Sequence, residues 1–305
     1  MISCDSQRFP AYVCKDCLRM KNSKVLFNEI VSGISLPETK EEIEAIAYVL
    51  LADYFDITKT QILADKVFPW SIKDDLKIQN ALVRINKGEP VQYISGKAFF
   101  FGRKFLVDPG VLIPRPETEE LVQEVISFVN QTGSETEPRI LDIGTGSGCI
   151  AVTLALEIPK ARVMATDISE KALATARKNI LTHKVQVQLL LHNILAQAIP
   201  FKDLSVIVSN PPYITFSEKD LMRKNVLEFE PHVALFVHDE DPLLFYRIIT
   251  HEAREGLMER GLLAFEINER YDQEVISLLK EAGFSDVQLV MDLSGKARIV
   301  KGIKA

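Results

Sequence analysis

Several features that mark particular classes of protein are missing from this chain of 305 residues. No apolar run reaches the roughly 18–20 residues that a membrane-spanning helix needs. The first 25 residues mix charged with apolar side chains, so no secretory signal is visible and we expect a cytoplasmic protein. Internal repeats and low-complexity segments are also missing. What remains is a composition of 47% hydrophobic and 26% charged residues, which is typical of a soluble globular protein.

Cysteine and histidine are scarce, which bears on disulfides and metal sites. Four cysteines are too few for a disulfide scaffold at this length. Cys14 and Cys17 form a lone CxxC pair, but a zinc site needs four ligands and no second pair completes the set. The five histidines show no metal-binding spacing such as HExxH. We therefore expect no metal cofactor, and we interpret residues 1–22 as a flexible extension that precedes the fold.

An excess of positive charge is missing too. The chain carries 36 Lys and Arg residues against 42 Asp and Glu residues, which gives a net charge of −6. Proteins that bind nucleic acid draw most of their affinity from phosphate neutralisation and usually show a basic face. The balance therefore favours a protein partner, and we expect no direct contact with nucleic acid or membrane.

The first part of the chain has helical periodicity. A helix entry at residues 35–38 precedes six apolar residues on one face: Ile43, Ile46, Ala47, Leu50, Leu51 and Tyr54. Shorter helices are expected at 58–65 and 72–86. Aromatic residues and glycines between 92 and 107 then predict a short β-hairpin. We expect a helical domain at residues 23–88, followed by a β-hairpin linker at 89–110.

The remainder, residues 111–305, alternates between strands and helices. After a helix around 117–130, the pattern predicts seven strands, at 139–143, 162–166, 185–190, 204–208, 261–267, 286–291 and 297–301. Helices are expected at 149–157, 170–182, 241–258 and 271–282. This alternation predicts an α/β fold, in which a parallel sheet is covered on both faces and ligands bind at the carboxyl ends of its strands. The last two strands are too close in sequence for a helical crossover and should form an antiparallel hairpin.

A glycine loop follows the first of these strands. It consists of Gly144, Thr145, Gly146, Ser147 and Gly148, and it lets a ligand lie against the main chain at a helix start. Asp167 ends the next strand, where its carboxylate can accept hydrogen bonds from both hydroxyls of a ribose. The loop suits S-adenosylmethionine, a dinucleotide or a purely structural turn. Asp142 favours S-adenosylmethionine, because a carboxylate suits a cationic amino acid moiety better than a pyrophosphate.

The fourth strand ends in Asn210, Pro211, Pro212 and Tyr213, at the sheet edge where the reactive methyl group should lie. Asn-Pro and Pro-Pro also break structure, so a simple turn is the alternative. Behind a matching glycine loop, the motif instead predicts methyl transfer to a planar amide or amino nitrogen. We expect the Asn210 side-chain oxygen and a backbone carbonyl near Pro211 to accept the two N–H groups of the target.

These acceptors hold the nitrogen lone pair in line with the methyl group and stabilise the positive charge that develops on nitrogen. The prolines restrict the local backbone, so the acceptors are aimed in advance. Tyr213 offers a flat surface against which the planar target can stack. We therefore assign Asn210, Pro211 and Tyr213 as catalytic residues, and Asn210 also borders the cofactor.

These motifs, in this order, closely resemble the HemK/PrmC family, the N5-glutamine methyltransferases of bacterial peptide-chain release factors. The resemblance runs from about residue 23 to the C-terminus and rests on five segments: 88–94, 112–119, 142–148, 210–213 and 229–235. The Asn-Pro-Pro-Tyr motif alone is shared with amino methyltransferases of DNA and RNA. The ordered combination is much more specific.

The resemblance implies a seven-stranded, Rossmann-like class I S-adenosylmethionine methyltransferase domain, a small helical N-terminal domain and a linking β-hairpin. We expect the helical domain to recognise the substrate, because it carries no visible chemistry. Its substrate would be the glutamine of the Gly-Gly-Gln motif in class 1 release factors. By motif position, the glycine loop and Asp167 would bind S-adenosylmethionine, and residues 210–213 would hold the glutamine. Arg115 and residues 117–119 would shape the cofactor pocket or the substrate cleft, unless Arg115 serves only in a surface ion pair.

One region departs from the family pattern. After the third strand, His192, Asn193 and Ile194 stand where the family often has an aspartate and an aromatic residue near the adenine. Asn193 can still accept a hydrogen bond from the adenine amino group, and Ile194 can pack on the ring. We interpret His192 as a surface residue at the strand end rather than a catalyst.

Two other functions stay open at this point. One is methylation of a different nitrogen, in a ribosomal-protein glutamine or at adenine N6. Adenine would have to be flipped into the pocket and would require a basic groove, against which the acidic balance argues. The other is a binding module without catalysis, against which the intact motifs argue.

Overall fold

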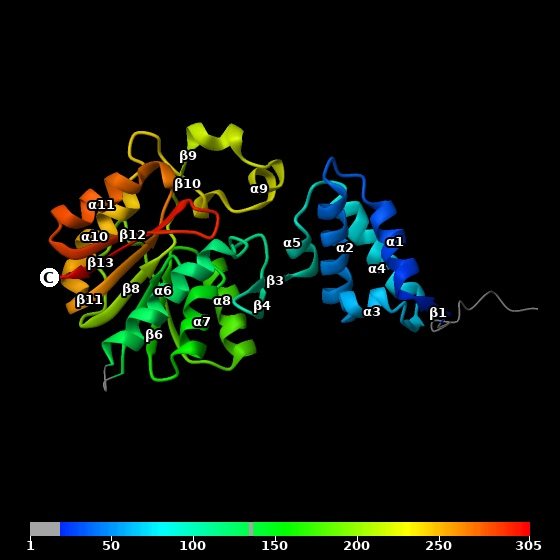
Figure 1. Cartoon of the computed structure of the whole chain (residues 1–305), viewed down its shortest axis with the longest axis horizontal. Coiled ribbons are helices and arrows are strands. Elements are labelled where there is room, and N and C mark those ends of the chain that lie inside the picture. The colour runs from blue at the N-terminus through cyan, green and yellow to red at the C-terminus, as the bar shows by residue number, and fades with distance from the viewer. Residues whose placement is uncertain (1–18, 134–136) are drawn as a thin grey trace, which may run out of the picture. The chain divides into compact units, whose positions relative to one another are not determined.

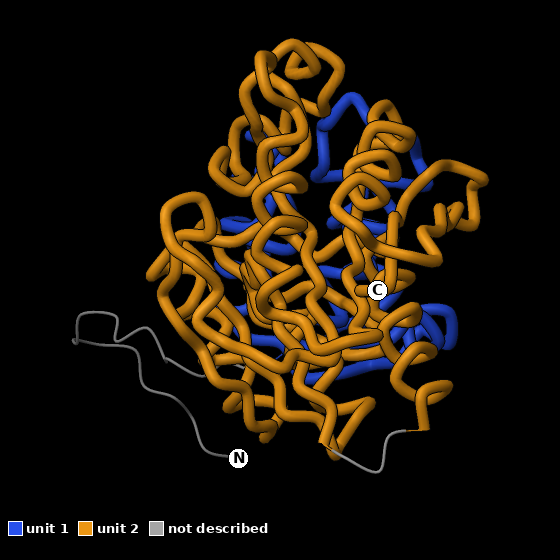
Figure 2. The backbone as a smooth tube through the Cα atoms, turned by 90° about the vertical axis from the view of Figure 1, so that its left-hand side faces the viewer, with its two compact units in different colours: residues 1–95 blue, residues 96–305 orange. Residues whose placement is uncertain are grey.

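The computed structural model describes residues 19–133 and 137–305, so the CxxC pair lies outside the described residues. The chain divides into two compact units, Met1–Ser95 and Gly96–Ala305 (Figure 2). This boundary falls within the segment 89–110 that we expected to be a linker. In the ranges that the structure describes, no helix combines the length and the apolar character needed to cross a bilayer.

The first unit is mainly helical, as predicted. Its helices are α1 (Ser23–Gly33), α2 (Lys40–Phe55), α3 (Lys59–Leu63), α4 (Ile72–Ile85) and α5 (Val91–Ser95). A capping box begins α2, in which the Thr39 side chain accepts from the Glu42 amide and the Glu42 side chain accepts in return. The buried residues Ile30, Leu50 and Trp70 belong to one apolar core in this unit.

The N-terminal boundary needs a correction. Residues 19–22 were assigned to a flexible extension, yet they form strand β1 (Arg19–Asn22), which pairs antiparallel with β2 (Val67–Trp70). Strand β2 was not predicted either, because its residues lie in a region of helical periodicity. Both strands are short, and each satisfies its backbone groups through the other. Pairing between segments so distant in sequence leaves no local signal.

The second unit is built on one sheet of seven strands, in the order β12-β13-β11-β8-β5-β6-β7. Their bounds are β5 (Arg139–Ile143), β6 (Arg162–Asp167), β7 (Val187–Leu191), β8 (Leu204–Ser209), β11 (Leu257–Glu266), β12 (Phe284–Met291) and β13 (Ala297–Lys304). Neighbours from β7 to β11 are parallel, whereas β13 is antiparallel to both β11 and β12. The strand order therefore reverses between β5 and β8. The seven predicted strands and the final hairpin are confirmed.

Helices cover both faces of this sheet (Figure 1). They are α6 (Glu117–Thr132), α7 (Cys149–Glu157), α8 (Glu170–His183), α10 (Leu244–Gly256) and α11 (Asp272–Glu281). Neighbouring residues of β5 point to opposite faces, since Ile140 belongs to one buried apolar cluster and Leu141 to the other. Burial on both faces explains why the strands read as continuous apolar runs rather than alternating ones.

Short elements follow β8 and complete the unit. They are β9 (Ile214–Thr215), η1 (Phe216–Leu221), α9 (Lys224–Phe229), η2 (His232–Ala234), β10 (Phe236–Val237) and η3 (Glu269–Tyr271). Strands β9 and β10 pair in parallel, so the two ends of the segment that follows the Asn-Pro-Pro-Tyr motif lie side by side.

The predicted β-hairpin exists as β3 (Lys97–Phe100) and β4 (Arg103–Leu106), and it belongs to the second unit. Asn179 of α8 holds it there, because its side chain accepts from the Leu106 amide at 2.7 Å and donates to the Leu106 carbonyl at 2.9 Å. Glu119 of α6 accepts from the Phe101 amide at 2.7 Å. The hairpin is thus part of the second unit.

Candidate active site

The predicted site residues meet at a cavity of about 190 Å³. It is lined from the loops that follow β5, β6, β7 and β8, at the carboxyl edge of the sheet. This is the place where the strand order reverses, and open α/β sheets bind their ligands at such a point. Eight of the predicted residues line it: Gly144, Gly146, Asp167, Asn193, Ile194, Asn210, Pro211 and Pro212.

Within the glycine loop, the glycines differ in what they do. Gly144 and Gly146 have φ angles of +76° and +56° and line the cavity. Apart from each glycine and its chain neighbours, no described residue has an atom within 4 Å of where a Cβ would stand. Gly148 has a φ of +81°, but a Cβ there would lie 3.1 Å from the Cβ of Ala176 in α8. The first two glycines therefore leave room for a ligand against the main chain, and Gly148 permits close packing of α8.

The two polar side chains of the loop are buried. Thr145 donates from its hydroxyl to Asp142 at 2.6 Å, and both Thr145 and Ser147 are almost fully buried. Asp142 is fully buried, and burial raises the pKa of its carboxyl to about 7. Asp142, which the sequence suggests as a partner for a cationic amino acid moiety, does not line the cavity and instead accepts the Thr145 hydrogen bond.

Asp167, at the end of β6, lines the cavity. Its two carboxylate oxygens accept from the amides of Gly146 at 2.9 Å and Ser169 at 2.8 Å. Burial raises the pKa of Asp167, and these backbone bonds oppose the shift. A carboxylate oxygen has two lone pairs, so each oxygen can accept one more hydrogen bond. That is the capacity needed for a ribose diol.

The segment after β7 also lines the cavity. The Asn193 side-chain oxygen accepts from the Leu195 amide at 3.0 Å and retains a second lone pair. His192 was interpreted as a surface residue, and this is wrong: it is 8% exposed, lines the cavity, and its Nε2 lies 3.0 Å from the Ala198 carbonyl oxygen. The loop that follows β7 folds back over the ring, which the strand pattern could not reveal.

The Asn-Pro-Pro-Tyr motif borders a second cavity of about 180 Å³. Asn210 and Pro211 line both cavities, whereas Tyr213 and Arg115 line the second. The Asn210 amide nitrogen donates to the Thr118 hydroxyl at 3.2 Å. One short segment therefore separates a site for a nucleoside-like ligand from a neighbouring small cavity.

Tyr213 and Thr118 share a buried acidic partner that the sequence did not reveal. Glu266, the last residue of β11, accepts from the Thr118 hydroxyl at 2.6 Å and from the Tyr213 hydroxyl at 3.1 Å. Burial raises the pKa of Glu266, while both hydrogen bonds and the charge of Arg298 oppose the shift. Burial likewise raises the pKa of the Tyr213 phenol well above its usual value, so the phenol stays protonated.

Arg115 is held by Glu230, an ion pair between two of the segments singled out in the sequence. Its guanidinium lies 2.6 Å from the Glu230 carboxylate, whose side chain is 1% exposed, and the Ile113 amide donates to the same carboxylate at 3.2 Å. A purely surface ion pair is therefore excluded for Arg115. The pair fastens the chain before α6 to the chain after α9.

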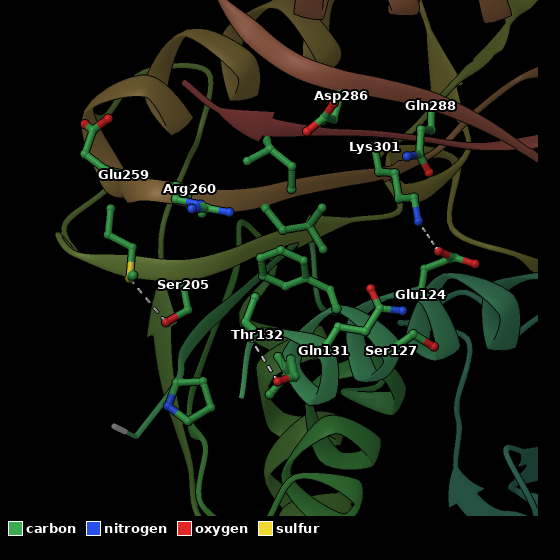
Figure 3. Close-up of a pocket in the computed structure, with 18 residues that line it drawn as sticks. Glu124, Ser127, Gln131, Thr132, Ser205, Glu259, Arg260, Asp286, Gln288 and Lys301 are labelled. Carbon is green, nitrogen blue, oxygen red and sulfur yellow. Dashed lines mark hydrogen bonds and ion pairs between the residues drawn. The ribbon is translucent and has the colours of Figure 1, made fainter. Parts of the chain in front are cut away.

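A larger cavity, of about 960 Å³, lies at the opposite edge of the sheet (Figure 3). It is lined by residues at the amino ends of β5 and β8, by β11 and β13, and by α6. An ion pair between Glu124 and Lys301 crosses it. Ligands of such sheets bind at the carboxyl ends of the strands, whereas this cavity lies at the amino ends of β5 and β8. We therefore do not assign it as the active site, although it is the larger cavity.

Known proteins resemble this chain over most of its length. A family model described as PrmC N-terminal domain matches residues 35–96, and one described as methyltransferase small domain matches residues 125–228. The release factor glutamine methyltransferase of Flavobacterium psychrophilum is 40% identical over 290 residues, which are 92% of this chain and 98% of that relative. The chain belongs to the release factor glutamine methyltransferase family. The enzyme of the same name from Bacteroides thetaiotaomicron is 44% identical over 261 residues, which cover 85% and 92% of the two chains.

Membership of this family makes the chain an S-adenosylmethionine-dependent methyltransferase, as predicted. A solved methyltransferase structure from Pyrococcus furiosus shares the fold, with a TM-score of 0.50 and 18% identity over 74% of this chain and 99% of that one. The predicted fold class, a seven-stranded methyltransferase domain with a helical N-terminal domain, is confirmed.

The larger of the two motif cavities fits the cofactor of this family. Open space stands beside Gly144 and Gly146, where a ligand can contact the main chain. Asp167 has acceptor capacity to spare for a ribose, and apolar side chains such as Ile194 and Phe245 line the same cavity, where an adenine ring can pack.

Proposed function

We propose that this enzyme transfers the methyl group of S-adenosylmethionine to the side-chain amide nitrogen, N5, of the glutamine in the Gly-Gly-Gln motif of class 1 release factors. One observation carries the proposal: Asn210 and Pro211 border both the cavity that suits the cofactor and the second cavity of about 180 Å³. A glutamine amide in the second cavity meets the cofactor at the Asn-Pro segment. The names of the relatives support the same substrate.

The proposed site binds the cofactor with five residues. Gly144 and Gly146 contact it through the main chain, Asp167 accepts from the ribose, and Asn193 and Ile194 bind the adenine. The loop residues Thr145, Ser147 and Gly148 support the cofactor site indirectly, because they shape the turn of the loop. The cofactor supplies an electrophilic methyl group, so the protein has to orient the acceptor rather than activate the donor.

The Asn-Pro-Pro-Tyr motif orients the target glutamine. An amide nitrogen is a weak nucleophile, because its lone pair is delocalised into the carbonyl group. The Asn210 oxygen and the Pro211 carbonyl accept the two N–H groups of the glutamine, and Pro212 and Tyr213 complete the walls of its site. Positioning of this kind can lower a barrier by roughly 7–11 kcal/mol, so a strong general base is not needed.

We further propose that the helical unit recognises the release factor. A family model described as PrmC N-terminal domain matches it, and the residues assigned to the chemistry all lie in the second unit. The expected cytoplasmic location belongs to the same proposal, because the proposed substrate is a protein of translation termination.

The test is to incubate the purified enzyme with labelled S-adenosylmethionine and a class 1 release factor, beside the same factor with its Gly-Gly-Gln glutamine changed to alanine. We expect label on the first factor only. Label on both factors would refute the assigned glutamine. Label on neither, with cofactor binding confirmed by calorimetry, would refute the substrate and direct the search to ribosomal proteins and nucleic acids.

A further inference from the structure

A chain of hydrogen bonds connects the buried carboxylate of Glu266 to the catalytic amide of Asn210. Glu266 is 1% exposed and accepts from the Thr118 hydroxyl at 2.6 Å. Thr118, which is 3% exposed, in turn accepts from the Asn210 amide nitrogen at 3.2 Å. The three residues come from β11, the first turn of α6 and the segment just after β8, so this series of hydrogen bonds exists only in the folded protein.

The carboxylate determines the direction of every bond in this chain. The hydrogen bonds from Thr118 and Tyr213 and the charge of Arg298 favour the ionised form of Glu266 against its burial. An ionised carboxylate has no hydrogen to give, so it can only accept. The single hydroxyl hydrogen of Thr118 is therefore used on Glu266, and the Thr118 oxygen can only accept from its other neighbour. Asn210 has to present its NH₂ group to Thr118. If the amide were reversed, its carbonyl oxygen would face an oxygen without a hydrogen, and the two acceptors would repel.

We propose that Glu266 and Thr118 are positioning residues that hold the Asn210 amide with its carbonyl oxygen available to the target nitrogen. This inference rests on the proposed function, in which that oxygen accepts an N–H group of the glutamine. In the reversed orientation, Asn210 would direct its own NH₂ group at the NH₂ group of the glutamine. Only one of the two orientations of Asn210 is productive, and a carboxylate two bonds away selects it.

The same carboxylate also holds the other end of the motif. Its second oxygen accepts from the Tyr213 hydroxyl at 3.1 Å. Glu266 therefore fastens both the first and the last residue of Asn-Pro-Pro-Tyr to the end of β11, one through Thr118 and one directly. Both polar side chains of the motif thus depend on a residue that lies 53 positions beyond Tyr213 in the chain.

Thr118→Val, Thr118→Ser and Thr153→Val test the proposal with matched changes. Thr118→Val removes the hydroxyl and keeps the shape, whereas Thr118→Ser retains the hydroxyl. Thr153, in α7, is also buried, but its hydroxyl has no hydrogen-bond partner among the residues that the structure describes, so Thr153→Val is the control for loss of a buried hydroxyl. We expect Thr118→Val to lower kcat by about tenfold to a hundredfold, as for a misplaced catalytic group. Thr118→Ser should restore most of kcat, and Thr153→Val should leave it unchanged.

Cofactor affinity separates a positioning role from a merely structural one. The dissociation constant for S-adenosylmethionine, measured by calorimetry, should change less than about threefold in Thr118→Val, because Thr118 is not among the residues that line the cofactor cavity. Equal kcat values for Thr118→Val and the wild-type enzyme would overturn the proposal. So would a loss that Thr118→Ser fails to restore, or one that Thr153→Val reproduces.

Glu266→Gln provides a second test, because the amide has nearly the same shape but carries hydrogens. With its NH₂ group toward Thr118 it would donate, free the Thr118 hydroxyl hydrogen and allow Asn210 either orientation. In the cofactor-bound enzyme, without any release factor, NMR can follow hydrogen exchange of the Asn210 side-chain amide, assigned by its absence from Asn210→Ala. We expect exchange about tenfold faster in Glu266→Gln and in Thr118→Val than in the wild-type enzyme.

This readout does not depend on the substrate, so the two proposals can fail separately. A wild-type enzyme that labels no release factor refutes the proposed function, whatever the exchange rates are. Unchanged exchange in both variants, in an enzyme that labels the release factor normally, refutes the positioning role alone.

Discussion

At the residue scale, the site contains two kinds of residue: those that line the ligand cavity, and those that hold the lining residues in place. Gly144, Gly146 and Asp167 line the cofactor cavity, whereas Thr145 and Asp142 form a buried pair behind the loop. The sequence motif contains both kinds without distinguishing them, because a motif records which residues are needed and not which way they point.

Asn210→Ala should leave cofactor binding nearly intact and reduce turnover. The side-chain oxygen is the proposed acceptor for the target amide, and removal of one such group typically costs about 10²–10³ in kcat. Calorimetry with S-adenosylmethionine, combined with single-turnover kinetics on a release factor, measures both quantities. Turnover within threefold of the wild-type value would contradict the proposed mechanism.

Asp167→Ala should weaken cofactor binding. Hydrogen bonds to a charged group contribute about 1.5–3 kcal/mol each, so loss of the two ribose contacts should raise the dissociation constant by at least about a hundredfold. Asp167→Asn retains one acceptor oxygen and should lie between the two. If calorimetry gave the same dissociation constant for all three proteins, Asp167 would not bind the ribose.

At the scale of elements, the sequence located most of the sheet but not what packs on its edge. The predicted strands at 139–143 and 204–208 agree closely with β5 (Arg139–Ile143) and β8 (Leu204–Ser209), because buried parallel strands are continuous apolar runs. The β1–β2 pair was missed, as was the attachment of the β3–β4 hairpin to α8. Both depend on partners far away in the chain, which no local pattern records.

Asn179→Ala should destabilise the second unit, since this fully buried side chain also donates to the Ser147 carbonyl at 2.8 Å. Its loss leaves backbone groups of the hairpin and of the glycine loop without partners, which should lower the free energy of unfolding by roughly 2–4 kcal/mol. Thr182→Ala, on the exposed face of the same helix, should change it by less than about 0.5 kcal/mol. Chemical denaturation measures both, and equal values for the two variants would contradict this account of Asn179.

At the scale of the whole molecule, the two units have different proposed tasks. The second unit carries the cofactor cavity, the motif and the hydrogen-bond chain from Glu266, and its apolar clusters lie on both faces of its own sheet. The helical unit has a separate core around residues such as Leu50 and Trp70. This division is consistent with our proposal that the second unit carries out the chemistry and the helical unit recognises the substrate.

A chain that begins at Gly96 should therefore bind the cofactor but methylate a release factor poorly. We expect kcat/KM for the intact factor to fall by at least about a hundredfold, with a cofactor dissociation constant close to that of the full chain. Circular dichroism would confirm that the shortened protein is folded. Methylation at the full rate by a folded protein of this length would remove the helical unit from substrate recognition.

The sequence by itself determined the enzyme class, the cofactor and the motif at the end of β8, because glycines, prolines and strand ends act through local backbone geometry. Only the tertiary structure decided which groups surround Asn210. Thr118 lies 92 positions before Asn210 and 148 before Glu266, so their contact depends on the order of strands in the sheet and on how α6 packs against it. Contacts over such separations arise from the packing of the whole domain, and no local pattern contains them.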